Sequence, residues 1–273
     1  MKQSEIIAYQ KLQLKMMKMI HQVCLENNIE YYIIGGTLLG SVRHKGFIPW
    51  DIDIDIAMTR ANYQKFKIVA ENKLPQQLIY MDYTKCHDFR PPHAIVEWVN
   101  SSVQHSSDMH ISKIYIDIFP LDYAPNSIEK QKQQANKIFI LKRLKTTKIL
   151  SRADKLNRNF FKRCFFKAFR LFSPFINIDI INNKLQAIMQ MYNMQENPKY
   201  LCSMASHYSY FKQCMPKEIY GKPQLMIFCD AKFFGPEKPD EYLKRIYGDY
   251  MKQPSIGEQQ KFKSYFMNAS WED

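Results

Sequence analysis

Apolar residues recur at helical spacing along the first part of the chain. Ile6, Met17 and Ile20 belong to a set spaced three or four positions apart, or multiples of this, which predicts an amphipathic helix over residues 3–27. The same periodicity predicts a helix over 60–73. We expect the methionines of the first helix to pack in the core.

Short β-rich apolar runs separate these helices. They predict strands over 31–34, 75–81, 94–99 and 115–119. Pro120 should end the last of them, since proline cannot donate a backbone hydrogen bond to a sheet.

Two polar residues are placed to begin helices. Thr37 can cap a short helix from Leu38 to His44. Asn126, with Glu129 three residues later, has a variant capping-box arrangement that would open a long helix reaching about Leu150.

The character of the chain changes near residue 125, from mixed helices and strands to a mostly helical, basic and aromatic pattern. With 46% hydrophobic residues, the 273-residue chain can bury a substantial core. We therefore predict an α+β protein in which residues 1–125 form a catalytic core around a mixed sheet. Residues 126–273 would form a mostly helical annex that completes the same domain.

Aspartate and aliphatic residues alternate strictly over 51–58, which is the period of a strand. Asp51, Asp53 and Asp55 would then share one face, and the three isoleucines between and after them would face the core. Three carboxylates on one face repel one another unless a cation lies among them. Oxygen-only ligands favour a hard ion, Mg²⁺ or Mn²⁺.

Other readings of this acidic run must be weighed. An EF-hand calcium loop requires glycine at its sixth position and glutamate at its twelfth, where this chain has Ile56 and Asn62. A solvated acidic strand without function, or carboxylates that protect a strand edge, would explain the alternation. Neither explains the glycine pair that precedes it.

Gly35 and Gly36 follow the first predicted strand in a chain with only 8 glycines. Without Cβ atoms they let the backbone approach a ligand, and the helix that begins at Thr37 presents free N–H groups to an anion. Two acids follow about fifteen residues later. This is the layout of a nucleotidyltransferase site, with phosphates on the turn and metal-bound phosphoryl oxygens beside the strand.

Positive charge is concentrated in one segment. The chain has 39 Lys and Arg against 26 Asp and Glu, a formal net charge of +13. Residues 143–170 contain ten of these basic residues and one acid, Asp154, and several phenylalanines lie near one helical face. Residues 143–172 could contact an anionic membrane, or they could pack as an ordinary helix, and both readings stay open. No nucleic-acid motif accompanies the charge, so we expect no nucleic-acid partner.

The cysteines and the N-terminus bear on location. The six cysteines are scattered without metal-finger spacing, so we expect reduced thiols and no structural zinc. The first residues lack the apolar region of a signal peptide, and no run of about 18 apolar residues occurs. We therefore expect a cytoplasmic protein that is soluble or peripheral on the inner membrane face.

Three blocks of sequence carry a family resemblance. The stretch GGTLLGSVRHKGFIPWDIDIDIAM (35–58) resembles the signature of the LicD family. IDIFPLD (116–122) and DEYLKRIYGDYM (240–251) are similar to two further blocks of that family, in the same order. The family commonly has Asp where this chain has Ile52. Because residue 52 falls on the predicted core face, we expect the metal ligands to be intact.

The resemblance implies a nucleotidyltransferase-type core and a set of site residues. Asp53 and Asp55 would be the main ligands of Mg²⁺ or Mn²⁺, with Asp51 as a further ligand or a neighbour. Asp117 would be the third carboxylate, holding a second metal ion or accepting a proton, unless it only caps the turn at Pro120. The residues that would bind the nucleotide phosphates are Gly35, Gly36, Thr37, Arg43 and Lys45, although Arg43 and Lys45 also suit the negative end of a helix.

The resemblance also implies a reaction. A phosphoryl-alcohol such as phosphocholine would move from a CDP-linked donor to a hydroxyl of a glycan or of its lipid-linked precursor. One alternative is a true nucleotidyltransferase that releases pyrophosphate from a nucleoside triphosphate. Another is a noncatalytic RNA- or lipid-binding protein, which the presence of both Asp53 and Asp55 argues against.

Overall fold

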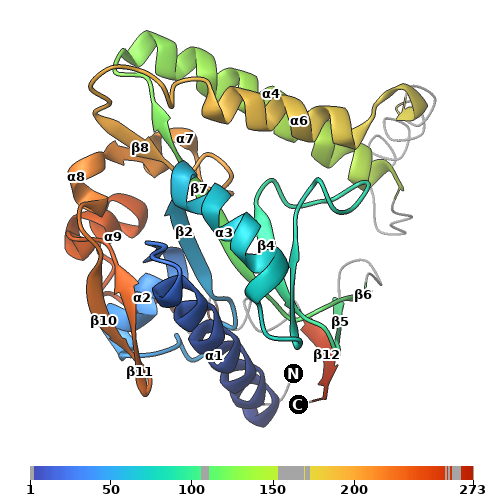
Figure 1. Cartoon of the computed structure of the whole chain (residues 1–273), viewed down its shortest axis with the longest axis vertical. Coiled ribbons are helices and arrows are strands. Elements are labelled where there is room, and N and C mark those ends of the chain that lie inside the picture. Colours follow the sequence, from blue (N-terminus) through green and yellow to red (C-terminus); the bar gives the residue numbers. More distant parts are fainter. Residues whose placement is uncertain are drawn as a thin grey trace.

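The protein is an α+β fold built around one mixed sheet in a computed structural model, which confirms the predicted class. The structure describes residues 3–105, 111–152, 173–255 and 266–272, and positions 169, 257 and 259. Figure 1 shows the long strand β7 running through the middle of the molecule, with helices on both sides of the sheet.

The central sheet has seven strands. Its main path is β1 (Tyr32–Ile33), β2 (Asp55–Thr59), β7 (Tyr115–Ala124), β4 (Ala94–Trp98) and β3 (Leu78–Met81). Strands β8 (Tyr200–Cys202) and β9 (Cys214–Pro216) continue the sheet from the second half of β7. β2 and β7 are parallel, whereas the other neighbours are antiparallel. The predicted strands are therefore present, most of them one to three residues shorter than expected.

Pro120 does not end its strand, which corrects the sequence prediction. β7 pairs with β4 through Tyr115–Ile118 and with β8 through Asp122–Ala124. Pro120 lies in the gap between these two antiparallel partners. The Asp117 N–H points to β2, so the even-numbered residues point to the other side, where Pro120 has no partner to donate to.

The three N-terminal helices are α1 (Gln3–Glu26), α2 (Gly35–His44) and α3 (Arg60–Lys73). α1 and α3 match the predicted helices closely, and Met16, Met17 and Ile20 of α1 are fully buried as expected. α2 begins two residues before Thr37, with Ile34 at its N-cap position. Thr37 therefore lies inside the helix instead of capping it.

The C-terminal part adds β8 and β9 to the central sheet, and several of its other elements contact the N-terminal part. Helices α4 (Ile128–Arg152) and α6 (Ile178–Gln190) pack side by side (Figure 1). The other elements described in this part are η1 (Ser173–Phe175), α7 (Tyr210–Gln213), α8 (Lys217–Tyr220), the hairpin of β10 (Gln224–Phe228) and β11 (Ala231–Gly235), α9 (Pro239–Tyr247) and β12 (Phe266–Trp271). β12 pairs with β5 (Ser101–His105), which also pairs with β6 (Ile111–Ser112). The strands in this part were not predicted.

The long helix α4 starts with a different cap from the one expected. Its N-cap is Ser127, whose hydroxyl accepts from the Lys130 N–H and donates to Glu129. Asn126 instead bridges to a distant loop: it donates to the Asn197 carbonyl and accepts from the Lys199 N–H. The Asn126 side chain, which the local sequence would assign to the helix cap, is thus engaged by residues at least 71 positions away.

Most of the basic segment 143–172, for which membrane contact and ordinary helix packing both stayed open, lies outside the described residues, because only 143–152 and 169 of it are described. Among the helices that the structure describes, none combines the length and apolar character needed to span a bilayer.

Candidate active site

The acidic run leaves the predicted strand geometry over its first half. Residues 51–54 are irregular, and β2 begins only at Asp55. The alternation of burial nevertheless holds, since Ile52, Ile54 and Ile56 are all buried in the core. The aspartates consequently face away from the core, as the sequence predicted.

Helix α1 holds the two segments that carry the acids. The side-chain amide of Gln10 donates to the backbone carbonyl of Asp51 at 2.7 Å and to that of Ile48 at 3.3 Å. One turn further, Gln13 donates to the Tyr115 carbonyl at 2.9 Å, at the start of β7. The irregular loop and the strand are therefore fixed against the same helix.

Asp55 and Asp117 are direct register partners on the parallel strands β2 and β7. The N–H of Asp117 donates to the Ile54 carbonyl at 3.1 Å, and the N–H of Asp55 donates to the Thr37 hydroxyl at 2.8 Å. The structure thus brings Asp117 beside the acidic run, which is the placement that the sequence predicted for a third carboxylate.

The glycine pair makes room for these carboxylates. A Cβ atom on Gly35 would lie 2.9 Å from Oδ2 of Asp55, and one on Gly36 would lie 2.6 Å from Oδ2 of Asp51. Gly35 also has a φ of +56°, a conformation that favours glycine. The two glycines bring the positive N-terminal end of α2 against the acids, where the helix dipole favours negative charge.

The four aspartates share one electrostatic environment. Burial raises the pKa of Asp51 above its usual value. Asp53 remains accessible to water, but the surrounding protein desolvates its carboxyl group, and this effect, with the charges of Asp51 and Asp117, raises its pKa well above the usual value. Burial, then Asp117, Asp53 and Asp51, raise the pKa of Asp55 in the same direction. Mutual repulsion of this kind is what a bound cation would relieve.

These side chains fit a hard divalent cation by chemistry. All four offer only carboxylate oxygens, the donors that Mg²⁺ and Mn²⁺ prefer. Within the described parts of the chain, no three acidic, histidine or cysteine side chains already converge on one point in a metal-binding arrangement. The carboxylates are thus close enough for their charges to raise the pKa of Asp53 and Asp55, without yet forming a closed ligand set.

A histidine that sequence reasoning missed contacts the site. Nε2 of His93 lies 2.6 Å from Oδ1 of Asp117, and the His93 ring packs on Phe119 with 4.0 Å between ring centroids. His93 directly precedes β4, the antiparallel neighbour of β7. Only the register of these two strands brings His93 to Asp117, and no local motif signals it.

Tyrosines from both halves of the chain surround the acids. Tyr9 of α1 is buried, and burial together with Asp53 and Asp117 raises its pKa above the usual value. Tyr242 of α9 is also buried, and its hydroxyl accepts from the Gly35 N–H at 3.2 Å. Tyr242 lies in the third sequence block of the family resemblance, which was the available signal for its place near the site.

Arg43 and Lys45 lie at the other end of α2, about 12 Å along the helix from Gly35. Arg43 donates to His44 at 2.9 Å and to the Tyr250 carbonyl at 2.8 Å. Lys45 takes a φ of +56° at the helix C-cap. Both positions suit the negative end of the helix dipole, and their contact with donor phosphates stays a prediction.

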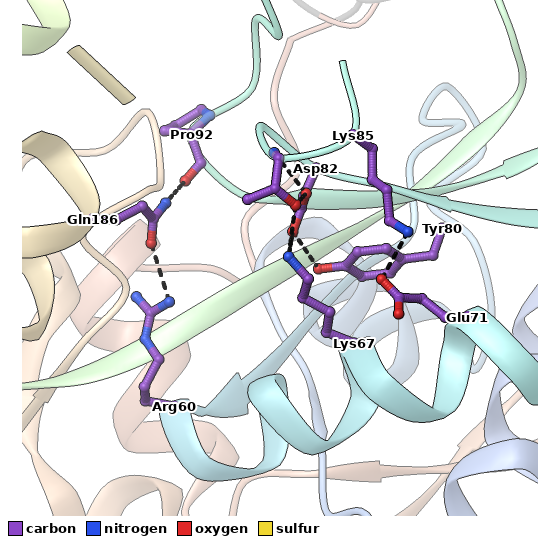
Figure 2. Close-up of polar contacts among 9 residues, drawn as sticks. Arg60, Lys67, Glu71, Tyr80, Asp82, Lys85, Pro92 and Gln186 are labelled. Carbon is purple, nitrogen blue, oxygen red and sulfur yellow. Dashed lines mark hydrogen bonds and ion pairs between the residues drawn. The ribbon is translucent and has the colours of Figure 1, made fainter. Parts of the chain in front are cut away.

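A buried ion pair lies at the opposite end of β2 from the acids. Arg60 donates to both carboxylate oxygens of Asp122, at 2.7 and 2.5 Å, and Asp122 is fully buried. Asp122 therefore lies inside β7 as part of a buried ion pair, and not in a turn. Figure 2 shows Arg60 continuing this network to Gln186, which in turn donates to the Pro92 carbonyl.

Comparisons with known proteins point to one family. Residues 28–146 match the family described as LicD/FKTN/FKRP, nucleotidyltransferase domain. Over 93% of this chain and 94% of the relative, the sequence is 28% identical to the lipopolysaccharide cholinephosphotransferase LicD of Haemophilus influenzae. A 62-residue stretch, 23% of this chain and 22% of the relative, is 46% identical to an uncharacterized protein of Rickettsia prowazekii. The matched family segment contains all four aspartates.

Proposed function

We propose that this chain is a LicD-type, metal-dependent phosphotransferase acting on a cell-surface glycan or its lipid-linked precursor. The match of residues 28–146 to the LicD family and the similarity to a cholinephosphotransferase along nearly the whole chain support this proposal. The donor would be CDP-choline or a CDP-linked polyol. Similarity along nearly the whole length to a lipopolysaccharide cholinephosphotransferase supports phosphocholine as the first group to test and lipopolysaccharide as the first acceptor.

In the proposed reaction, an acceptor hydroxyl attacks the β-phosphorus of the donor. A new oxygen–phosphorus bond forms, the bond to the bridging oxygen breaks, and CMP leaves. Asp53 and Asp55, with Asp51 beside them, would hold Mg²⁺ or Mn²⁺. The bound ion would supply charge neutralisation at the phosphoryl oxygens. Asp117 would accept the proton of the hydroxyl or hold a second ion.

The observation that carries this proposal is the grouping of four aspartates beside the N-terminal end of α2. Asp55 and Asp117 are register partners. The carboxylates of Asp51 and Asp55 occupy the space that Cβ atoms at the glycine pair would need. A merely solvated acidic surface would not place Asp53 and Asp55 where the protein desolvates them and where neighbouring carboxylates raise their pKa.

The test is incubation with CDP-choline, CDP-ribitol or CDP-glycerol, Mg²⁺ and a glycan extract, with CMP release as the readout. We expect metal-dependent CMP release from one donor, and its loss in Asp53→Asn and Asp55→Asn. Asp230→Asn is the matched control, because Asp230 is an exposed aspartate paired with Lys18.

Two results would contradict the proposal. Pyrophosphate release from a nucleoside triphosphate, with no CMP from any donor, would establish true nucleotidyl transfer on the same site. Equal activity of the wild type and both aspartate variants would show that these carboxylates take no part in the reaction.

Membrane contact through residues 143–172 stays a separate prediction. In the described part of this region and just before it, Lys137, Phe139 and Arg143 of α4 are exposed. Flotation with phosphatidylglycerol vesicles, compared with phosphatidylcholine vesicles, tests it. Binding only to the anionic vesicles would support a membrane-surface role, whereas no binding would favour ordinary packing of the basic segment.

A further inference from the structure

His93 makes the only hydrogen bond to the Asp117 side chain among the residues that the structure describes. Its Nε2 lies 2.6 Å from Oδ1, and both side chains are largely buried, with 11% and 17% exposure. A carboxylate that binds a cation is ionised and only accepts hydrogen bonds, so in the role proposed below Nε2 would donate to Oδ1. Oδ1 is thereby occupied, and Oδ2 remains available to a ligand.

His93 is hydrogen-bonded through only one of its two ring nitrogens within the described structure. Nδ1 is buried and has no hydrogen-bond partner within the described structure. The ring is held instead by packing on Phe119, with 4.0 Å between centroids and an interplanar angle of 34°. No second polar group competes with Asp117 for the histidine.

The segment that carries His93 is anchored to the C-terminal half of the chain. Gln186 of α6 donates to the Pro92 carbonyl at 3.0 Å and accepts from Arg60 at 3.1 Å (Figure 2). Nearby, Asn182 of the same helix donates to the Phe89 carbonyl at 3.2 Å. Helix α6 thus fixes the backbone immediately before His93 from two points.

We propose that His93 is a positioning residue that fixes the carboxylate of Asp117 for cation binding, and that α6 sets the position of His93 through Gln186. This inference rests on the proposed function, because it assigns His93 a role toward the metal ligands of that site. It also gives the C-terminal annex a function in the active site, since Gln186 lies outside residues 1–125.

The test compares His93→Ala with His93→Gln, whose amide nitrogen can replace the donor at Nε2. Binding of Mn²⁺ is measured without substrate, by the loss of the free-ion signal in electron paramagnetic resonance. Hydrogen-bond partners of metal ligands typically contribute about 10–100-fold to metal affinity or activity. We expect His93→Ala to weaken Mn²⁺ binding and to lower kcat within that range, with little change in KM for the donor, and His93→Gln to recover most of both.

Two further variants separate positioning from folding. His87→Ala is the matched control, since the His87 side chain is fully exposed on the surface, and it should bind Mn²⁺ as the wild type does. Gln186→Met removes the support of the Pro92 carbonyl without removing His93, and should weaken Mn²⁺ binding less than His93→Ala. Thermal melting of each variant verifies that it is folded.

The outcomes are distinct. Wild-type Mn²⁺ affinity in His93→Ala overturns the inference, and so does a folded His93→Gln protein that stays as impaired as His93→Ala. If the wild type binds Mn²⁺ but releases no CMP from any donor, the proposed reaction is wrong, and the Mn²⁺ titrations still decide the role of His93. If the wild type binds no Mn²⁺, the inference is overturned whether or not CMP is released.

Discussion

The carboxylate of Asp51 occupies the space beside Gly36, with Oδ2 2.6 Å from the position that a Cβ atom would take. Asp51 belongs to a loop that Gln10 holds against α1, and Gly36 belongs to the first turn of α2. Neither partner can move aside freely. The absence of a side chain at Gly36 therefore determines how closely Asp51 approaches the positive end of α2.

Gly36→Ala should slow CMP release strongly without unfolding the protein. The added methyl group must displace the Asp51 carboxylate, and a misplacement of about 1 Å in an active site can cost about 10²-fold in rate. CMP release and a thermal melt would be measured together. Gly257→Ala is the control, because a Cβ atom there would meet nothing within 4 Å. Full activity of Gly36→Ala would show that the Asp51 loop adapts and that its close contact is dispensable.

Asp122→Asn should destabilise the fold strongly. Asp122 is fully buried and receives two hydrogen bonds from Arg60, so the substitution leaves a largely buried guanidinium without its countercharge. Breaking a buried pair in this way costs about 3–5 kcal/mol of the free energy of unfolding. Urea unfolding curves at neutral pH measure it.

The control for this variant is an ion pair on the surface. Lys244 and Asp240 lie one turn apart on α9 with both side chains exposed, so Asp240→Asn should leave the urea midpoint unchanged. A similar shift of the urea midpoint in both variants would show that the geometry and burial of the Arg60 pair add nothing.

The sequence was informative wherever a local pattern decided the structure. The spacing of apolar residues predicted α1 and α3, and the acid–aliphatic alternation predicted which side of residues 51–56 is buried. Each of these predictions needs only neighbours within a few positions along the chain. The place of Asp117 beside the acids came instead from the family resemblance, through the block IDIFPLD (116–122).

The errors share a cause in contacts between distant segments. Pro120 continues its strand because β7 changes partners there, from β4 to a strand that lies near residue 200. The Asn126 side chain hydrogen-bonds to the loop at 197–199 instead of capping its helix. His93 reaches Asp117 only through the register of β4 and β7. No local pattern contains this information.

The stabilising contribution of Asp82 should depend on pH. Burial by itself would raise the pKa of Asp82, but hydrogen bonds from Lys67 and from the N–H and hydroxyl of Thr84 outweigh it and lower the pKa below the usual value (Figure 2). A carboxyl group with a lowered pKa stabilises the folded state above the pKa of the unfolded chain, about 3.9. That stabilisation is lost as the pH falls through the lowered pKa.

Urea unfolding of the wild type and Asp82→Asn across this range would measure the effect. We expect the wild type to be more stable at pH 7 and pH 5, with the difference shrinking below about pH 4, as the linkage relation requires. Glu71→Gln is the control, because the Glu71–Lys85 pair is more exposed. A difference that stays constant down to pH 3 would mean that Asp82 acts through packing and not through its charge.

Asp53→Asn should change stability in opposite directions with and without metal. Without metal, the protein around Asp53 and the charges of Asp51 and Asp117 disfavour its ionised form, so removing this charge should raise the melting temperature. With Mg²⁺ or Mn²⁺, the wild type should gain stability by mass action, whereas the variant should gain little because it lacks a ligand. Melting curves in EDTA and at rising Mg²⁺ concentration therefore should cross. Asp230→Asn should follow the wild type in both conditions. A variant that melts below the wild type in EDTA would show that the Asp53 carboxylate stabilises the fold without a cation, and the repulsion argued for this site would then be wrong.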